Sequence, residues 1–355
     1  MYGISLLKPR LEVGPSDVTC PVRACRCRLP LQPALFRMTP EYRCPIHRIY
    51  VSANVFAYER EAENLLWTGE DDLVLLHGGR RLGRDIGLAR DNSERAVTWN
   101  VFRWLETSGA LGELLERWTG RPAIPNEVVY WGYAPERDGT WAPLLRARTA
   151  FEEDEHEATE PAVVIVTDDT VFVLDPRLAG AASTPRVPTG WERYEQGAKG
   201  WPAAVFSGHV RPFASDKGRF ELLRLWLLGT HMAEQVGKAF ELLHLVPAWS
   251  AAPMLADLAS HLVQDGRRKA RRVSWEDVHA FVSADHPTAR DAEAVVTYLE
   301  EKSAGYGPDG VLRRAFALDY AARPESSARS LSGPDSAADA GSNPRSSSTS
   351  RTLMT

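Results

Sequence analysis

Three ionisable residues, Glu160, Asp175 and Arg177, flank a predicted β-hairpin at its open end. Two runs rich in Val, Ile, Leu and Phe surround the pair Asp168-Asp169, so a two-residue turn there folds one strand back on the other. With that turn, Ala162 faces Asp175. Glu160 then faces Arg177, and all four side chains project from one face of the sheet. Acids beside a cation at such an edge can hold a divalent metal and a phosphate.

The same residues carry a family resemblance. Pro161-Ala162 followed by Asp175-Pro176-Arg177 resembles the signature of the PD-(D/E)XK nuclease superfamily, which includes the restriction-endonuclease-like folds. That signature has aspartate after the proline, then an acid, one further residue and lysine, so Ala162 and Arg177 depart from it. The resemblance covers roughly residues 91–247. It implies Mg²⁺-dependent hydrolysis of phosphodiester bonds in nucleic acid, with DNA as the expected partner and Asp175 as a metal ligand.

Three more residues are candidates for this site, each with an ordinary alternative. Glu94 begins a helix expected after 91–93, where it is either a partner of the helix dipole or, as the resemblance implies, an acid of the metal site. Glu160 is either a second metal ligand or the cross-strand ion-pair partner of Arg177. Lys199 is either a surface lysine or a substitute for the family's catalytic lysine, which in some members lies on the following helix.

The departures from the signature set the expected function. A methyl group at Ala162 cannot coordinate Mg²⁺, and Arg177 keeps its proton near neutral pH while it can clamp phosphate oxygens. We therefore expect a weak or inactive member of the nuclease superfamily that acts on nucleic acid. The alternative is a catalytically inert nuclease-fold protein that binds nucleic acid or a protein partner. A chance match of the hairpin within another α/β fold is the third possibility.

All four cysteines lie in one short stretch near the amino terminus. Cys44-Pro-Ile-His47 resembles one knuckle of a zinc ribbon, and the other ligand pair is Cys20 with Cys25 or Cys25 with Cys27. In a reducing compartment such clustering indicates a metal before a disulfide. A structural Zn²⁺ would fold a small module that cannot build its own core. The alternative is a set of free or buried thiols and a surface histidine.

Bulk composition is that of an ordinary globular protein. Of 355 residues, 25% are charged and 44% are apolar, and the net charge of −5 excludes a global basic field. No apolar run is long enough to cross a bilayer and no signal-peptide core is present, which favours the cytoplasm and no membrane partner. The sequence does not predict an oligomeric state.

The elements expected around the hairpin are those of an α/β fold with a mixed central sheet flanked by helices. We expect helices from 91–93 onward and over 111–118, strands over 128–133 and 141–151, then the hairpin, a helix within 218–240 and a strand over 241–247. The predicted domain plan is a Cys-rich, zinc-ribbon-like module (1–50), a connecting segment (51–90), the nuclease-like core (91–250), a helical extension (251–306) and a disordered tail (307–355).

Overall fold

Strands β8 (Val163–Thr167) and β9 (Thr170–Pro176) form the predicted hairpin, and every residue of both strands is buried. Val164 pairs with Val173 across a two-residue turn at 168–169, so the predicted register is confirmed. The near-continuous apolar sequence of both strands suits a central position in a sheet that is covered on both faces.

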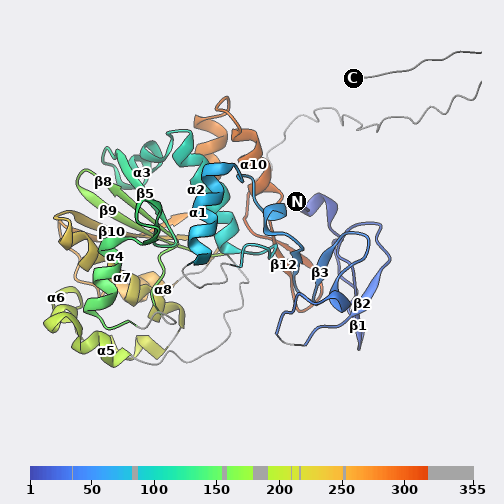
Figure 1. The fold of residues 1–355 in the computed structure, drawn as a ribbon, viewed down its shortest axis with the longest axis horizontal. Helices are drawn as coiled ribbons and strands as arrows, with labels where there is room; N and C mark the ends of the chain where they lie inside the picture. The colour runs from blue at the N-terminus through green and yellow to red at the C-terminus, as the bar shows by residue number, and fades with distance from the viewer. Residues whose placement is uncertain are drawn as a thin grey trace, which may run out of the picture. The chain divides into compact units, whose positions relative to one another are not determined.

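A five-stranded mixed sheet surrounds this hairpin in the order β11-β10-β9-β8-β5 (Figure 1). The other strands are β5 (Pro125–Tyr130), β10 (Ala239–Val246) and β11 (Arg268–Ser274). Strand β8 runs antiparallel to both β5 and β9, whereas β10 runs parallel to both β9 and β11. A parallel neighbour needs a crossover connection, which includes the long helix α7 (Lys217–Gln235).

Helices cover both faces of the sheet, as predicted for an α/β fold. Phe172 and Leu174 of β9 point into one apolar core, together with helices α1 (Glu70–Arg81), α2 (Glu94–Thr107), α3 (Leu111–Thr119), α9 (Trp275–Ala280) and α10 (Ala292–Glu300). Val171 and Val173 point into the opposite core, together with α4 (Ala142–Ala150), α5 (Trp191–Gln196), α6 (Trp201–Val205), α7 and α8 (Pro253–Ala259).

This computed structural model describes residues 1–33, 35–81, 87–153, 158–178, 191–208, 210–215, 217–250 and 253–318. Short elements complete it: strands β6 (Tyr133–Ala134) and β7 (Gly139–Thr140), 3₁₀ turns at Ile4–Leu6, Pro40–Tyr42, Glu61–Asn64, Pro135–Arg137, Gly197–Gly200 and Phe213–Ser215, and a π turn at Phe281–Asp285. Within these residues, no helix is long and apolar enough to cross a membrane.

One predicted strand is a helix. Residues 141–151 were expected to be extended, but Ala142–Ala150 form α4. Pro143 suits the first helical turn, where no intrahelical partner awaits its missing N–H. The buried residues Leu144, Ala147 and Phe151 recur at helical spacing and pack against the α7 side of the sheet. In a short apolar segment, the spacing of apolar residues does not distinguish a helix from a strand. Packing against the rest of the fold therefore determined that this segment is helical.

The amino-terminal residues build a third, smaller core. It contains two short hairpins, β1 (Asp17–Thr19) with β2 (Arg28–Pro30) and β3 (Ile49–Val51) with β4 (Phe56–Tyr58). Three of the four cysteines are buried among its apolar residues. This core has fewer buried residues than the two cores beside the sheet, so a bound metal could contribute to its folding.

The carboxy-terminal part differs from the prediction at its end. The tail was expected to begin at residue 307, yet Leu312–Arg314 form β13, which pairs with β12 (Ser303–Tyr306). Phe316 is buried against Trp275, so apolar contacts order the chain beyond the predicted boundary. Met1–Leu318 form one compact unit, and the rest of the predicted tail, 319–355, lies outside the described residues.

Candidate functional site

A cluster of charged side chains lies where β9 and β10 end. Asp175 and Arg177 belong to the end of β9, and His244 of β10 is the register partner of Asp175. Glu221 comes from α7, and Glu94 is the first residue of α2. The carboxyl ends of parallel strands meet at one edge of a sheet, so the fold itself brings these five residues together.

Arg177 is the centre of this cluster. Its Nη2 lies 2.8 Å from Oδ1 of Asp175 and 2.7 Å from Oε2 of Glu221, and its Nε donates to Oδ2 of Asp175 at 3.2 Å. Burial lowers the pKa of Arg177, but the carboxylates of Asp175, Glu221 and Glu94 outweigh burial and raise that pKa. The guanidinium therefore stays charged and supplies the positive charge among these acids.

Two of the acids respond to this environment in opposite directions. Burial raises the pKa of Asp175, but Arg177 and His244 outweigh burial and hold that pKa below its ordinary value. Burial also raises the pKa of Glu94, and there the opposing effects of Arg177 and the Leu178 N–H do not cancel it. Oε1 of Glu94 accepts from the Leu178 N–H at 2.8 Å, which ties helix α2 to the end of β9.

His244 makes a further hydrogen bond to Asp175. Its Nδ1 lies 2.8 Å from Oδ2 of Asp175, and the imidazole is fully buried. An ionised carboxylate only accepts hydrogen bonds, so the proton of this bond lies on Nδ1. Nε2 has no hydrogen-bond partner among the described residues. Both oxygens of Asp175 thus accept hydrogen bonds from Arg177 or His244 within the protein.

The outcomes for the other predicted residues differ. Glu94 lies close enough to Arg177 and Asp175 for their charges to act on its pKa, Arg177 lowering that pKa and Asp175 raising it. The predicted Glu160–Arg177 ion pair is wrong, because Glu160 pairs with Arg95 of α2 at 3.0 Å. Strand β8 begins at Val163, so alternation along the strand does not govern the Glu160 side chain. The Lys199 side chain lies outside the described residues.

Sequence reasoning missed two members of the cluster. His244 is one of two polar residues, with Glu241, in an otherwise apolar strand, which is a usable signal for a buried functional or paired side chain. Glu221 lies in the first turns of an amphipathic helix, where acids are common on solvated faces. No pattern in the sequence distinguished it from a surface glutamate.

A second cluster is made by the amino-terminal cysteines. One ligand atom each from Cys20, Cys25, Cys44 and His47 lies within 4.8 Å of the other three. Nδ1 of His47 is 3.6 Å from the sulfurs of both Cys20 and Cys44, and Cys25 is 3.9 Å from Cys44. Of the two predicted ligand pairs, Cys20 with Cys25 is therefore the one that the structure places near Cys44 and His47. Cys27 is a free, half-buried thiol outside this set.

The donor set fits a closed metal site. Three sulfurs and one imidazole nitrogen are the ligands of a tetrahedral structural centre, with no position left open for catalysis. Among the described residues, this is the one group of three or more Cys, His, Asp or Glu side chains placed to share a metal ion. The carboxylates around Arg177 do not form such a group, and no observation supports Mg²⁺ there.

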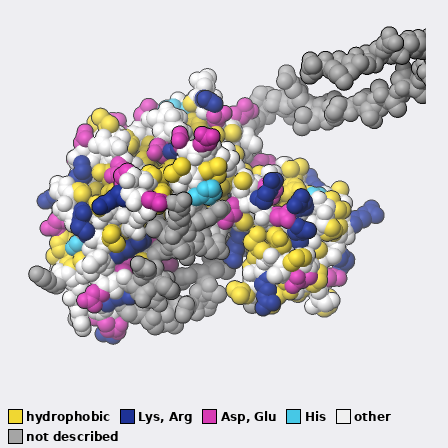
Figure 2. All heavy atoms as spheres, viewed as in Figure 1, with side chains coloured by type: hydrophobic (Ala, Val, Ile, Leu, Met, Phe, Trp, Pro, Cys, Tyr) yellow, Lys and Arg dark blue, Asp and Glu magenta, His cyan; other side chains and the backbone are white. Residues whose placement is uncertain are grey.

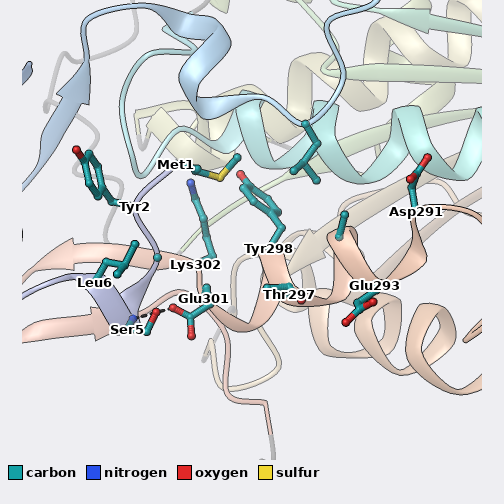
Figure 3. A pocket seen from close by; sticks show the side chains of 13 residues that line it. Met1, Tyr2, Ser5, Leu6, Asp291, Glu293, Thr297, Tyr298, Glu301 and Lys302 are labelled. Atoms are coloured by element: carbon teal, nitrogen blue, oxygen red, sulfur yellow. Dashed lines mark hydrogen bonds between the residues drawn. The ribbon is translucent and has the colours of Figure 1, made fainter. Parts of the chain in front are cut away.

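A separate cavity of about 630 Å³ lies between the first residues of the chain and helix α10 (Figure 3). Leu6, Leu66 and Tyr298 contribute apolar surface, and Glu293 and Lys302 are among its charged residues. Lys302 already lies 3.8 Å from the buried carboxylate of Asp91. None of the residues lining this cavity belongs to the Arg177 cluster or to the Cys₃His cluster.

No protein-family model, no curated protein and no solved structure matches this chain. A functional interpretation therefore rests on the arrangement of its own residues.

Proposed function

We propose that this chain is a PD-(D/E)XK-type protein that has lost metal-dependent cleavage and retains nucleic-acid binding. The observation that carries the proposal is the position of Arg177, whose guanidinium bonds to Asp175 and Glu221 and also faces Glu94. In a metal-dependent nuclease of this kind, acids at the end of the hairpin share a divalent cation. Here an arginine supplies the positive charge instead.

The order of elements supports the nuclease ancestry. Helix α2 precedes three antiparallel strands, and helix α7 then leads to β10, which runs parallel to β9. The register of the hairpin supports the loss of chemistry, because Val163 pairs with Leu174. In sequence, Ala162 and Asp175 are the next residues outward from that pair, so alanine occupies the position of the first acid of the signature. Mg²⁺ takes one or two carboxylates together with phosphate oxygens and water. Ala162 removes one of them, and Arg177 with His244 engages the other.

The Cys₃His cluster has a structural role in this proposal. We assign Zn²⁺ to it, because thiolates and imidazole in a closed tetrahedral set are the preferred ligands of that ion. Binding would bring the loop of Cys20 and Cys25 against the turn of Cys44 and His47, and so contribute to folding of the small amino-terminal core.

Cleavage and binding assays on a panel of single- and double-stranded DNA and RNA test the proposal. We expect the wild-type chain to bind nucleic acid and to show no cleavage with Mg²⁺ or Mn²⁺. The double variant Ala162→Asp/Arg177→Lys restores the acid and the lysine of the signature, so it should gain metal-dependent cleavage. Its matched control, Ala162→Asn/Arg177→Lys, has nearly the same shape without the added carboxylate and should stay inactive.

Two results would overturn this proposal. Wild-type cleavage that disappears in Asp175→Ala would show that the hairpin is still catalytic. Failure of the folded wild-type chain to bind any member of the panel would remove the nucleic-acid partner.

A further inference from the structure

We infer that nucleic-acid phosphates bind the amino-terminal module through one surface, which the Cys₃His cluster holds in place. We call this surface the basic face and define it by the cations Lys8, Arg23 and Arg26 and the apolar residues Leu6 and Ile46. The inference rests on the nucleic-acid binding proposed above and adds the location of the binding surface.

Charge is unevenly divided along the chain. Residues 1–50 contain eight Lys or Arg and three Asp or Glu, a net charge of +5, although the whole chain carries −5. One Zn²⁺ with three thiolates would lower the charge of the module by only about one unit. Figure 2 shows several Lys and Arg side chains on the surface of this module. A local basic surface on an acidic protein is the electrostatic pattern expected of a phosphate-binding module.

Two acids of the amino-terminal module pair with a cation outside the basic face. The acids nearest in sequence, Glu12 and Asp17, both pair with Arg28, at 3.1 and 2.8 Å. Within the described part of the chain, Lys8, Arg23 and Arg26 form no ion pair with a carboxylate. Their charge is therefore available to an external anion.

Backbone contacts hold two of these cations in position. Nζ of Lys8 donates to the carbonyl oxygen of Cys25 at 2.7 Å, and Nε of Arg23 donates to that of Leu7 at 2.9 Å. The Nη groups of Arg23 take no part in the hydrogen bond to Leu7, and Arg23 is exposed. A guanidinium fixed at Nε presents its remaining donors with little entropy to lose, which favours phosphate binding.

The metal-binding turns carry the rest of the face. Arg23 and Arg26 belong to the loop that contains Cys25, and Ile46 lies between the ligands Cys44 and His47 with 67% of its surface exposed. Because the four ligand atoms lie within 4.8 Å of one another, the two turns are neighbours. An exposed isoleucine on the neighbouring turn offers an apolar contact for a sugar or base.

A second arginine-rich segment, strand β11, has fewer unpaired cations among the described residues. Arg271 pairs with the buried Glu241 at 2.7 Å, and Arg268 pairs with Asp265 at 2.7 Å. Nη2 of Arg272 donates to the carbonyl oxygen of Ala248 at 2.9 Å. Arg268 and Arg271 are therefore neutralised by acids, and the exposed Arg272 is held by backbone carbonyl oxygens of residues 247, 248 and 250.

Binding of the full chain to fluorescein-labelled duplex DNA, measured over a range of salt concentrations, tests the inference. The variant is Arg23→Glu/Arg26→Glu. The control, Arg137→Glu/Arg290→Glu, makes the same change in net charge at two exposed arginines outside the module. For the variant we expect roughly tenfold weaker binding or more, and a salt dependence less steep by about two phosphate contacts. The control should keep the wild-type salt dependence.

The outcomes separate this inference from the function on which it rests. If the wild-type chain binds neither this DNA nor any other member of the DNA and RNA panel, the proposed function fails. If it binds DNA and Arg23→Glu/Arg26→Glu binds equally well, only the location is wrong. Equal losses in variant and control would indicate a general charge effect and would also overturn the location. Displacement of DNA by poly-glutamate at equal charge concentration would assign the face to an acidic protein instead.

Discussion

Replacement of Arg177 by methionine should destabilise the fold, because it leaves three carboxylates without their common counter-charge. Breaking a buried ion pair at one partner costs about 3–5 kcal/mol. The side chain of Asp175 is 6% exposed, but those of Arg177 and Glu221 are 27% and 36% exposed. Solvent therefore screens part of the effect, and we expect a loss of about 2–4 kcal/mol in the free energy of unfolding at neutral pH.

The loss should depend on pH with a defined sign. In the wild-type chain the pKa of Asp175 is held below its ordinary 3.8, so its contribution to stability is present above that pH and disappears as the pH falls through the folded-state pKa. Without Arg177, burial dominates and raises the pKa of Asp175 and, further still, that of Glu94. Ionised acids then oppose folding, so the penalty of Arg177→Met should be largest at neutral pH and should shrink on acidification.

Urea denaturation followed by circular dichroism, at neutral and mildly acidic pH, measures these effects. The double variant Asp175→Asn/Arg177→Met also removes the buried carboxylate that Arg177→Met leaves without a counter-charge. Its loss in free energy of unfolding should therefore be smaller than the sum of the losses in the two single variants, by at least about 1 kcal/mol. As a control, Arg211→Met breaks an exposed pair with Glu192 and should change stability by less than about 0.5 kcal/mol. A neutral Arg177→Met, or strictly additive changes, would refute our account of the cluster.

Three further predictions concern other parts of the chain. Metal analysis should find one Zn²⁺ per chain that is lost in Cys44→Ser and kept in Cys27→Ser; loss in both would place Cys27 in the site. Ser93→Ala removes the side-chain cap of helix α2 and should lower the melting temperature, at a cost of about 1 kcal/mol, whereas Ser93→Asp should not. Lys302→Met leaves the buried carboxylate of Asp91 without its ammonium partner and should cost about 3 kcal/mol in urea denaturation, a penalty that a second change, Asp91→Asn, should reduce.

Local patterns in the sequence were enough for several elements. The hairpin register followed from two β-rich runs and a two-residue turn, since side chains alternate along strands. The start of α2 followed from Ser93, whose side chain accepts from the Ala96 N–H. Residues 141–151 show the limit of such reasoning, because a short apolar segment fits a buried strand as well as a buried helix. Their helical state depends on packing against α7.

The sequence by itself determined which residues of strands β8 and β9 face each other, and it brought Cys44 and His47 onto one turn. Only the tertiary structure decided the partners of Arg177 and Glu160. Arg177 meets Glu221 and Glu160 meets Arg95, in pairs separated by 44 and 65 positions along the chain. Such pairs depend on where α2 and α7 lie against the edge of the sheet. Side-chain spacing within one element carries no information about that placement, which follows from packing of the two apolar cores.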